Sequence, residues 1–365
     1  MRVRAAVAES PGAGITIAEL DLEAPRRGEV LVRMRAAGIC QSDVHVLDGW
    51  MPAPFPLVLG HEGAGVVEAI GADVSRLRVG DHVVLTIAPS CGVCGYCLEG
   101  RPNLCDLAWN LSGRGGLFDG TPRFSRRGGP VHQFSFTSSF ADAVVVPDAA
   151  AVALSDEVPF DVAALFGCAI VTGVGAVVNT ARLRAGSTVA VIGCGGVGLS
   201  VIQGARIAGA RRIIAVDVQS AKLERAAQAG ATATVQAGSD EAAAAIKELS
   251  PGGVEYAFEA VGLPGTIRAA WDALGRGGTA VVVGLTRSDA EVALPAFDFV
   301  REKRILGCYY GSARPGRDIP MLVDLYRDGR LRPEVALEHA IGLDEIEKAF
   351  ARMRTGEAGR TIIRL

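Results

Sequence analysis

The stretch of residues 187–218 limits the possible folds more than any other part of the chain. It reads STVAVIGCGGVGLSVIQGARIAGARRIIAVDV. A β-rich run leads into Gly193-x-Gly195-x-x-Gly198, a helical stretch follows, and a second β-rich run ends at Asp217, 19 residues beyond the last glycine. A lone GxGxxG is weak, but the flanking strand, helix and acid complete a dinucleotide-binding fingerprint. The pattern therefore predicts a doubly wound α/β domain.

The residues of this fingerprint also predict which coenzyme binds. Glycines let the backbone approach a pyrophosphate, whose charge is stabilised at the helix N-terminus. Asp217 would accept hydrogen bonds from the adenosine ribose and would repel a 2′-phosphate, so NAD is favoured over NADP. The alternative is a packing turn in some other βαβ unit that binds no nucleotide.

A second constraint is the segment CGVCGYCLEGRPNLC at residues 91–105, which holds half of the eight cysteines. A disulfide knot and a metal site are the two interpretations. The N-terminal MRVRAAVAESPG reaches Glu9 and Pro11 without an apolar core, so we expect no signal peptide and a cytoplasmic protein. Disulfides are uncommon in that reducing compartment, which favours the metal site.

Four thiolates with Cys-x-x-Cys spacing suit a tetrahedral Zn²⁺ ion and leave no coordination position open. We therefore expect a structural zinc site, whose ligands would be Cys91, Cys94, Cys97 and Cys105.

The composition excludes several classes of partner. The chain has 365 residues, of which 49% are hydrophobic and 21% charged, with a formal net charge of −3. This length predicts roughly two domains. The absence of a polybasic cluster argues against nucleic acid and membrane surfaces as partners. No 18 apolar residues follow one another without interruption, so we expect no transmembrane helix.

Three further residues could form a second zinc site. Cys40 lies in GICQSDVH (38–45), His61 in LGHEGAGVVEAIG (59–71) and Cys168 in FGCAIVTGVG (166–175). Two thiolates and one imidazole leave a fourth position open, which is the ligand set of a catalytic zinc. Each residue alone is weak evidence, and spacing cannot unite residues so far apart. The neighbouring acids Asp43 and Glu62 are of the kind that orients metal ligands.

These motifs together resemble the zinc-dependent medium-chain alcohol dehydrogenases over nearly the whole chain. In that family the matching positions make Cys40, His61 and Cys168 the ligands of the catalytic zinc and the four clustered cysteines those of the structural zinc. The segments 216–232, 256–262, 281–285 and 359–365 are also similar to family segments. The long stretch between Cys105 and Cys168 resembles the dimeric branch, which includes the glutathione-dependent class.

The resemblance implies an α/β protein with a GroES-like, β-rich catalytic domain and a Rossmann coenzyme-binding domain. Residues 1–169 would form the catalytic domain and residues 170–309 the NAD domain, and residues 310–365 would return to the catalytic domain. The segment KRILGCYYG (303–311) has the character of an edge strand, which must be covered or paired. In dimeric relatives this region joins two subunits, so a homodimer is expected.

The resemblance further implies reversible hydride transfer between an alcohol and NAD. Ser42 and His45 would carry the released proton toward solvent, Asp43 would orient His61, and Glu62 would lie behind the metal. Gln41 departs from the family, because many relatives carry Arg or His there to reach the pyrophosphate. The remaining cofactor contacts carried over are Thr172, Val197, Lys222 and Arg360, the last reaching the pyrophosphate.

The resemblance also assigns a mostly apolar substrate pocket, which suits hydrophobic primary alcohols, aromatic or medium-chain. Its residues would be Ser42, Met51, Ile87, Asn110, Phe134, Leu285 and Tyr309. A glutathione adduct is less favoured, because Trp109 and Asn110 stand where that class places an arginine. Two rival classes of protein are a medium-chain reductase without catalytic zinc and a zinc-stabilised binding protein without catalysis.

Overall fold

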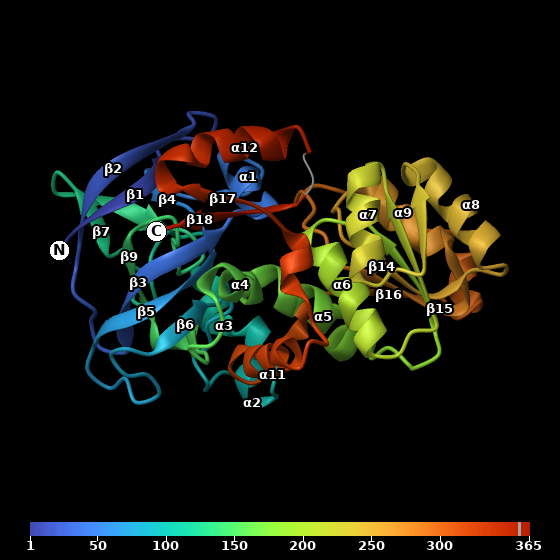
Figure 1. Cartoon of the computed structure of the whole chain (residues 1–365), viewed down its shortest axis with the longest axis horizontal. Helices are drawn as coiled ribbons and strands as arrows, with labels where there is room; N and C mark the ends of the chain where they lie inside the picture. Colours follow the sequence, from blue (N-terminus) through green and yellow to red (C-terminus); the bar gives the residue numbers. More distant parts are fainter. Residues whose placement is uncertain (357–358) are drawn as a thin grey trace. The chain divides into compact units, whose positions relative to one another are not determined.

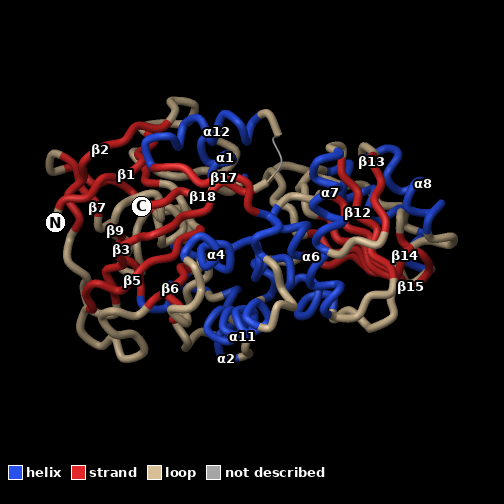
Figure 2. Tube along the Cα trace, viewed as in Figure 1, coloured by secondary structure: helices blue, strands red, loops and turns tan. Residues whose placement is uncertain are grey.

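The computed structural model describes residues 1–356 and 359–365, which form two compact units (Figures 1 and 2). The first unit comprises Met1–Cys168, Arg314–Asp324 and Leu337–Leu365, and the second comprises Ala169–Ala313 and Leu325–Ala336. Each unit contains its own clusters of buried hydrophobic residues.

The first unit is built mainly of β-strands. A closed barrel has the order β1-β2-β7-β8-β4, and a sheet has the order β10-β6-β5-β3-β18-β17, with β9 paired to β3. The strands are β1 (Arg2–Ala8), β2 (Ile15–Leu22), β3 (Glu29–Gly38), β4 (Leu57–Val58), β5 (Glu62–Ile70), β6 (His82–Leu85), β7 (Phe124–Arg126), β8 (Gly129–Gln133), β9 (Ala143–Pro147), β10 (Ala151–Ala153), β17 (Leu337–Gly342) and β18 (Arg360–Arg364).

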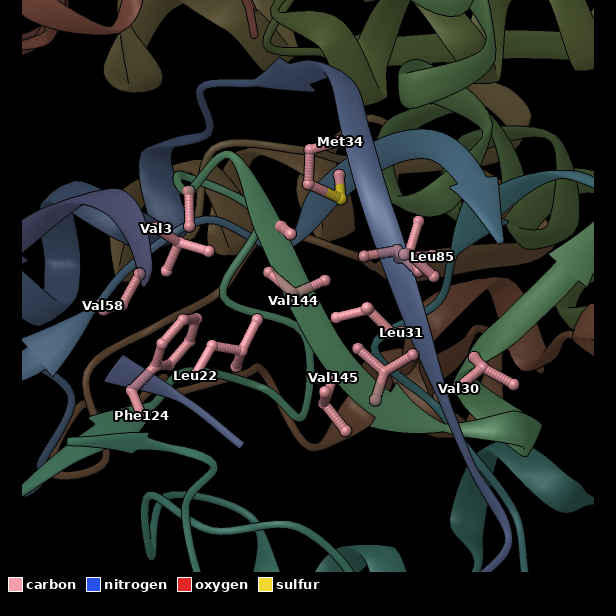
Figure 3. Packing of buried hydrophobic residues seen from close by; sticks show 14 of the residues in the cluster. Val3, Leu22, Val30, Leu31, Met34, Val58, Leu85, Phe124, Val144 and Val145 are labelled. Carbon is pink, nitrogen blue, oxygen red and sulfur yellow. The ribbon is translucent and has the colours of Figure 1, made fainter. Parts of the chain in front are cut away.

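Strand β3 is the centre of the hydrophobic core of this unit. One face of its sequence EVLVRMRAAG is apolar, with Val30, Val32 and Met34 fully buried, whereas the other face carries the half-buried Arg33 and the exposed Arg35. Leu31 and Met34 of β3 pack with Val144 of β9 and Leu85 of β6, as Figure 3 shows. Since β3 pairs with β5, β9 and β18, it is a rigid support for the residues that follow it.

Short helices connect or flank these strands. They are α1 (Gln41–Leu47), α2 (Gly95–Leu98), α3 (Asp106–Leu111), α4 (Phe160–Leu165), most of α11 (Pro315–Arg327) and α12 (Ile346–Arg354).

The second unit is a doubly wound α/β domain. Its six-stranded sheet has the order β13-β12-β11-β14-β15-β16, and all its pairs are parallel. The strands are β11 (Thr188–Ile192), β12 (Arg212–Asp217), β13 (Ala233–Gln236), β14 (Val254–Glu259), β15 (Leu274–Val282) and β16 (Arg304–Gly307). The helices are α5 (Val171–Gly175), α6 (Gly196–Ile207), α7 (Ser220–Ala229), α8 (Ser239–Leu249), α9 (Pro264–Asp272) and α10 (Phe297–Val300).

The two architectures confirm the predicted fold class. Strand β11, TVAVI, is buried along its whole length, as a central strand covered on both faces should be. Strand β13 was not anticipated, because ATVQ has half-buried and exposed residues in alternation and lies at the sheet edge.

The division of the chain differs from the expected return to the catalytic domain at residue 310. Residues 325–336 belong to the second unit, because their backbone is held by its helices. The side chain of Gln203 on α6 donates to the Arg332 carbonyl at 3.2 Å and accepts from the Arg332 N–H at 2.7 Å. Val335 and Ala336 are buried in the hydrophobic cluster that includes α6.

One helical run, Phe160–Ala181, is by length and composition apolar enough to span a membrane. Its most apolar window has a mean hydropathy of 2.0, but 89% of that window is buried inside the protein. That burial is typical of a core helix. The run contains two π-helical stretches, Phe166–Ile170 and Ala176–Ala181.

Candidate active site and metal centres

The first unit brings together four side chains that could hold a metal ion, and they come from three segments. The donor atoms of Cys40, His61, Glu62 and Cys168 all lie within 4.8 Å of one another, and all four residues are buried. Cys40 immediately precedes α1, His61 immediately precedes β5, Glu62 is the first residue of β5, and Cys168 lies in a π-helical stretch. Such π-helical distortions are frequent at functional sites.

Two glycines allow this convergence. Gly60, directly before His61, has φ +91, a conformation that side-chain-bearing residues rarely adopt. Gly167, directly before Cys168, approaches β6 so closely that an added Cβ would lie 2.2 Å from the Leu85 carbonyl oxygen. Both glycines are therefore required by the local backbone geometry.

His61 is oriented for metal binding. Its Nδ1 lies 3.1 Å from Asp43 Oδ1, whereas its buried Nε2 has no hydrogen-bond partner among the described residues. Burial lowers the pKa of His61, but Asp43 and the Cys40 thiolate raise it more strongly, to well above its ordinary value. A cation that displaces the Nε2 proton would bind the Nε2 lone pair, while Nδ1–H continues to donate to Asp43.

The two thiols of this cluster are coupled. A hydrogen bond with Cys168 lowers the pKa of Cys40 well below its ordinary value and raises the pKa of Cys168. The two cysteine sulfurs and the His61 Nε2, which has no hydrogen-bond partner among the described residues, are donors of the kind that Zn²⁺ prefers. The residues present therefore fit a zinc ion.

Glu62 lies next to these donors in a fully buried position. Burial raises the pKa of Glu62 to about 7, although the Arg360 guanidinium opposes this. The Arg360 Nη2 lies 3.0 Å from Glu62 Oε1, and its Nη1 donates to the Ile39 carbonyl at 2.7 Å. The sequence suggested only a pyrophosphate contact for Arg360 and missed this ion pair; the pyrophosphate contact stays a prediction.

The segment 134–140, FSFTSSF, holds the chain around His61. Thr137 Oγ1 donates to the Gly60 carbonyl at 3.1 Å, and the Ser139 N–H donates to the same oxygen at 2.9 Å. The ring of Phe134 contacts His61 edge-on, with centroids 5.6 Å apart. Phe134 was expected as a substrate contact, and the structure places it against a candidate metal ligand.

The candidate proton-relay residues lie on α1. Ser42 Oγ is 3.9 Å from Cys40 Sγ, and His45 is 8% exposed on the last turn of the helix. The indole of Trp50 stacks on the His45 ring, with centroids 4.9 Å apart and an angle of 16° between the planes. This contact was not foreseen, because nothing in the sequence shows which way Trp50 turns.

The four clustered cysteines form the second candidate metal centre. Their sulfur atoms lie within 4.8 Å of one another around α2. The Cys94 N–H donates to Cys91 Sγ at 3.4 Å, and the Cys91 N–H donates to Cys105 Sγ at 3.3 Å. Burial raises the pKa of Cys91, but backbone N–H groups outweigh burial and lower this pKa to about 7. Burial raises the pKa of Cys97 to about 12. N–H donors aimed at sulfur stabilise thiolates, as a closed zinc site requires.

The dinucleotide fingerprint lies in the second unit as a strand–turn–helix. Gly193 has φ +93, and an added Cβ on Gly198 would lie 1.8 Å from the Gly193 oxygen. Gly195 precedes the first turn of α6, which contains Val197. Asp217 at the end of β12 accepts from the Cys194 N–H at 2.8 Å and from the Gln219 N–H at 3.0 Å. The carboxylate therefore ties the glycine-rich turn to the end of β12.

The remaining predicted residues are distributed over both units. Lys222 is half-buried in the first turn of α7, and Thr172 is buried in α5. In the first unit, Gln41 and Asn110 are exposed, whereas Met51 and Ile87 are half-buried. In the second unit, Leu285 and Tyr309 are 44% and 39% exposed. A cavity of about 410 Å³ in the first unit is lined by Arg76, Arg314 and Arg317 among others, and by no candidate metal ligand.

Comparison with known proteins identifies the family. Residues 26–156 match the family described as "Alcohol dehydrogenase GroES-like domain", and residues 196–327 match "Zinc-binding dehydrogenase". An S-(hydroxymethyl)glutathione dehydrogenase of Paracoccus denitrificans is 37% identical, with 100% of both chains covered. An alcohol dehydrogenase zinc-binding domain protein of Burkholderia ambifaria is 39% identical, with a TM-score of 0.95 and coverage of 100% and 99%. Benzyl alcohol dehydrogenase of Acinetobacter calcoaceticus is 36% identical, with the same TM-score and coverage.

A β-rich unit with two cysteine-containing donor sets, joined to a doubly wound dinucleotide-binding unit, defines a zinc-dependent dehydrogenase. The chain belongs to the zinc-dependent alcohol dehydrogenase family, which confirms the predicted resemblance.

Proposed function

We propose that this chain is an NAD-dependent zinc alcohol dehydrogenase acting on hydrophobic primary alcohols and their aldehydes. The observation that carries the proposal is the buried His61 Nε2, which has no hydrogen-bond partner in the described part of the chain and lies beside two thiols, in a chain with a complete dinucleotide fingerprint. A reductase without catalytic zinc or a binding protein has no use for this combination.

The residues divide the chemistry between them. Cys40, His61 and Cys168 would hold the catalytic zinc, and the four clustered cysteines would hold the structural one. When bound, zinc would supply the Lewis acidity that favours the ionised hydroxyl of the alcohol, and the nicotinamide coenzyme would supply the hydride acceptor. Ser42 and His45 move the proton away from the substrate, while Asp43 fixes the orientation of His61.

The apolar pocket proposed from the family positions sets the substrate class. Ile87 stands where an aromatic ring is common in relatives, so the inner pocket should accept aromatic and medium-chain alcohols. The benzyl alcohol dehydrogenase with a TM-score of 0.95 supports this substrate class. The 37% identical S-(hydroxymethyl)glutathione dehydrogenase supports a second candidate substrate, a glutathione adduct.

One assay tests both candidates. Nicotinamide absorbance with NAD⁺ should show kcat/KM rising about fourfold per methylene from ethanol upward, because a buried CH₂ contributes about 0.8 kcal/mol. Benzyl alcohol should be a good substrate, and polyols should be poor. A clear preference for S-(hydroxymethyl)glutathione would replace the main proposal with the second one. Metal analysis should find two zinc ions per chain, and a single zinc would contradict both.

We also propose a cytoplasmic homodimer. Strand β16 is at the edge of the sheet and carries Leu306, which is 37% exposed. Phe297, Phe299 and Val300 of the neighbouring α10 are more than half exposed. An edge strand with exposed apolar side chains is normally covered, and a second copy of the chain would cover this one.

A further inference from the structure

The contact between Trp50 and His45 is built into the backbone of the first unit. The Trp50 N–H donates to the His45 carbonyl at 2.8 Å, and the Met51 N–H approaches the same oxygen at 3.2 Å. Gly49 between them has φ +75, which turns the chain back over the last turn of α1. The indole is therefore held against the imidazole by the turn that ends the helix.

The stacked indole also covers one face of the His45 ring. The imidazole is 8% exposed, whereas Trp50 on its outer face is 40% exposed. Two rings nearly parallel at 4.9 Å leave no room for water between them. Offset stacking of this kind is favourable and fixes ring orientation.

Burial and the neighbouring charges shift the pKa of His45 in opposite directions. Burial lowers the pKa of His45, while the Cys40 thiolate and Asp48 raise it. Asp48 also forms an ion pair with Arg354, whose Nη2 lies 3.0 Å from Asp48 Oδ1. The positive guanidinium partly offsets the effect of the Asp48 carboxylate on the imidazole. The result is a neutral imidazole near physiological pH, which is the form that accepts a proton.

We infer that Trp50 is a positioning residue of the proton relay, which holds the His45 ring in one orientation and shields it from water. The inference rests on the proposed function of the chain, because it requires His45 to accept the proton of the substrate. Trp50 acts through His45 and contacts no reacting atom.

The first measurement does not depend on activity. The chain has five histidines, so selective ¹³C labelling at Cε1 of the zinc-loaded enzyme should give five resonances, and His45→Gln identifies that of His45. Loss of the indole ring current in Trp50→Leu should move this resonance downfield and its titration midpoint to higher pH. Trp50→Phe, which retains a stacked ring, should move it less. A His45 resonance that is unchanged in Trp50→Leu would overturn the contact.

The second measurement tests whether the contact serves catalysis. General base catalysis contributes about 10²–10⁴-fold, so partial disordering of the relay in Trp50→Leu should lower kcat/KM for alcohol oxidation about tenfold. In the His45→Gln background the same change should have no further effect, and Trp50→Phe should recover most of the loss. Equal losses in both backgrounds, or none in either, would overturn the positioning role.

The two proposals fail in different ways. An enzyme that oxidises no alcohol contradicts the proposed function, and the histidine spectrum still decides whether Trp50 holds His45. An active enzyme in which the two substitutions act independently contradicts the role of Trp50 alone.

Discussion

The preference for NAD should depend on the carboxylate of Asp217. This group accepts hydrogen bonds from two backbone N–H groups, those of Cys194 and Gln219, and each carboxylate oxygen keeps a further lone pair for the adenosine ribose. Asp217→Asn retains the size of the side chain and one acceptor oxygen but removes the charge. Asp217→Ser removes both the charge and the contact with the glycine-rich turn.

The expected magnitude follows from these contacts. A hydrogen bond to a charged group contributes about 1.5–3 kcal/mol, so Asp217→Asn should lower kcat/KM for NAD⁺ about ten- to hundredfold. Two unit charges 4 Å apart repel by about 4 kcal/mol at an effective dielectric constant of 20, before screening by salt. Removal of the carboxylate should therefore raise kcat/KM for NADP⁺ about tenfold or more, and the half-buried Lys222 would be left as an attractive charge.

The assay compares kcat/KM for both coenzymes at fixed ionic strength, with thermal unfolding as the control for the fold. Asp217→Ser should lose more NAD⁺ activity than Asp217→Asn, because it also frees the Cys194 N–H. An unmutated enzyme that already prefers NADP⁺ would refute the interpretation of this acid. Equal losses for both coenzymes in Asp217→Asn would show that the carboxylate only orders the turn.

Three further predictions concern the metals, the coenzyme and the assembly. Cys40→Ser should abolish turnover and leave one zinc ion per chain. Cys94→Ser should instead lower the melting temperature, because structural zinc contributes folding energy directly. Full activity in Cys40→Ser would contradict the assignment of the catalytic site. Gln41→Arg should tighten NADH and lower kcat if coenzyme release limits turnover, and tighter NADH with unchanged kcat would show that release is not the slow step. Light scattering should find a dimer that Leu306→Lys converts toward monomer, and a stable unmutated monomer would exclude the dimer.

The sequence predicted the parts of the molecule whose determinants are local. The four clustered cysteines lie within fifteen residues, and the dinucleotide fingerprint is one strand, one turn and one helix. In both cases the residues that meet are close together in the sequence, so a local pattern identifies them. Strand β13 was not predicted from the sequence, because ATVQ is short and only half-buried. Its burial pattern differs little from that of a loop.

The residue types suggested the candidate catalytic donor set, but only the resemblance united its members, because three distant segments supply them. Cys40 follows β3, His61 immediately precedes β5, and Cys168 lies in a helix whose π-helical stretch no simple periodicity predicts. The backbone conformation of residues 135 and 136 could not be predicted from the sequence either. Ser135 and Phe136 both have positive φ, and the buried Phe136 packs edge-on against Phe118, with centroids 5.7 Å apart. Tertiary packing stabilises a backbone that local preference disfavours.

The position of Arg360 shows why the last strand belongs to the candidate active site. Strand β18 runs antiparallel to β3, with Ile362 opposite Gly38, so the chain passes Ile39 and Cys40 as it enters the strand at Arg360. The register therefore brings the Arg360 guanidinium close to the residues that precede α1, where it donates to the Ile39 carbonyl and pairs with the buried Glu62. A carboxylate fully removed from water needs such a partner to remain ionised. Arg360, near the end of the chain, thus favours the ionised form of Glu62, which lies beside the candidate zinc ligands Cys40, His61 and Cys168.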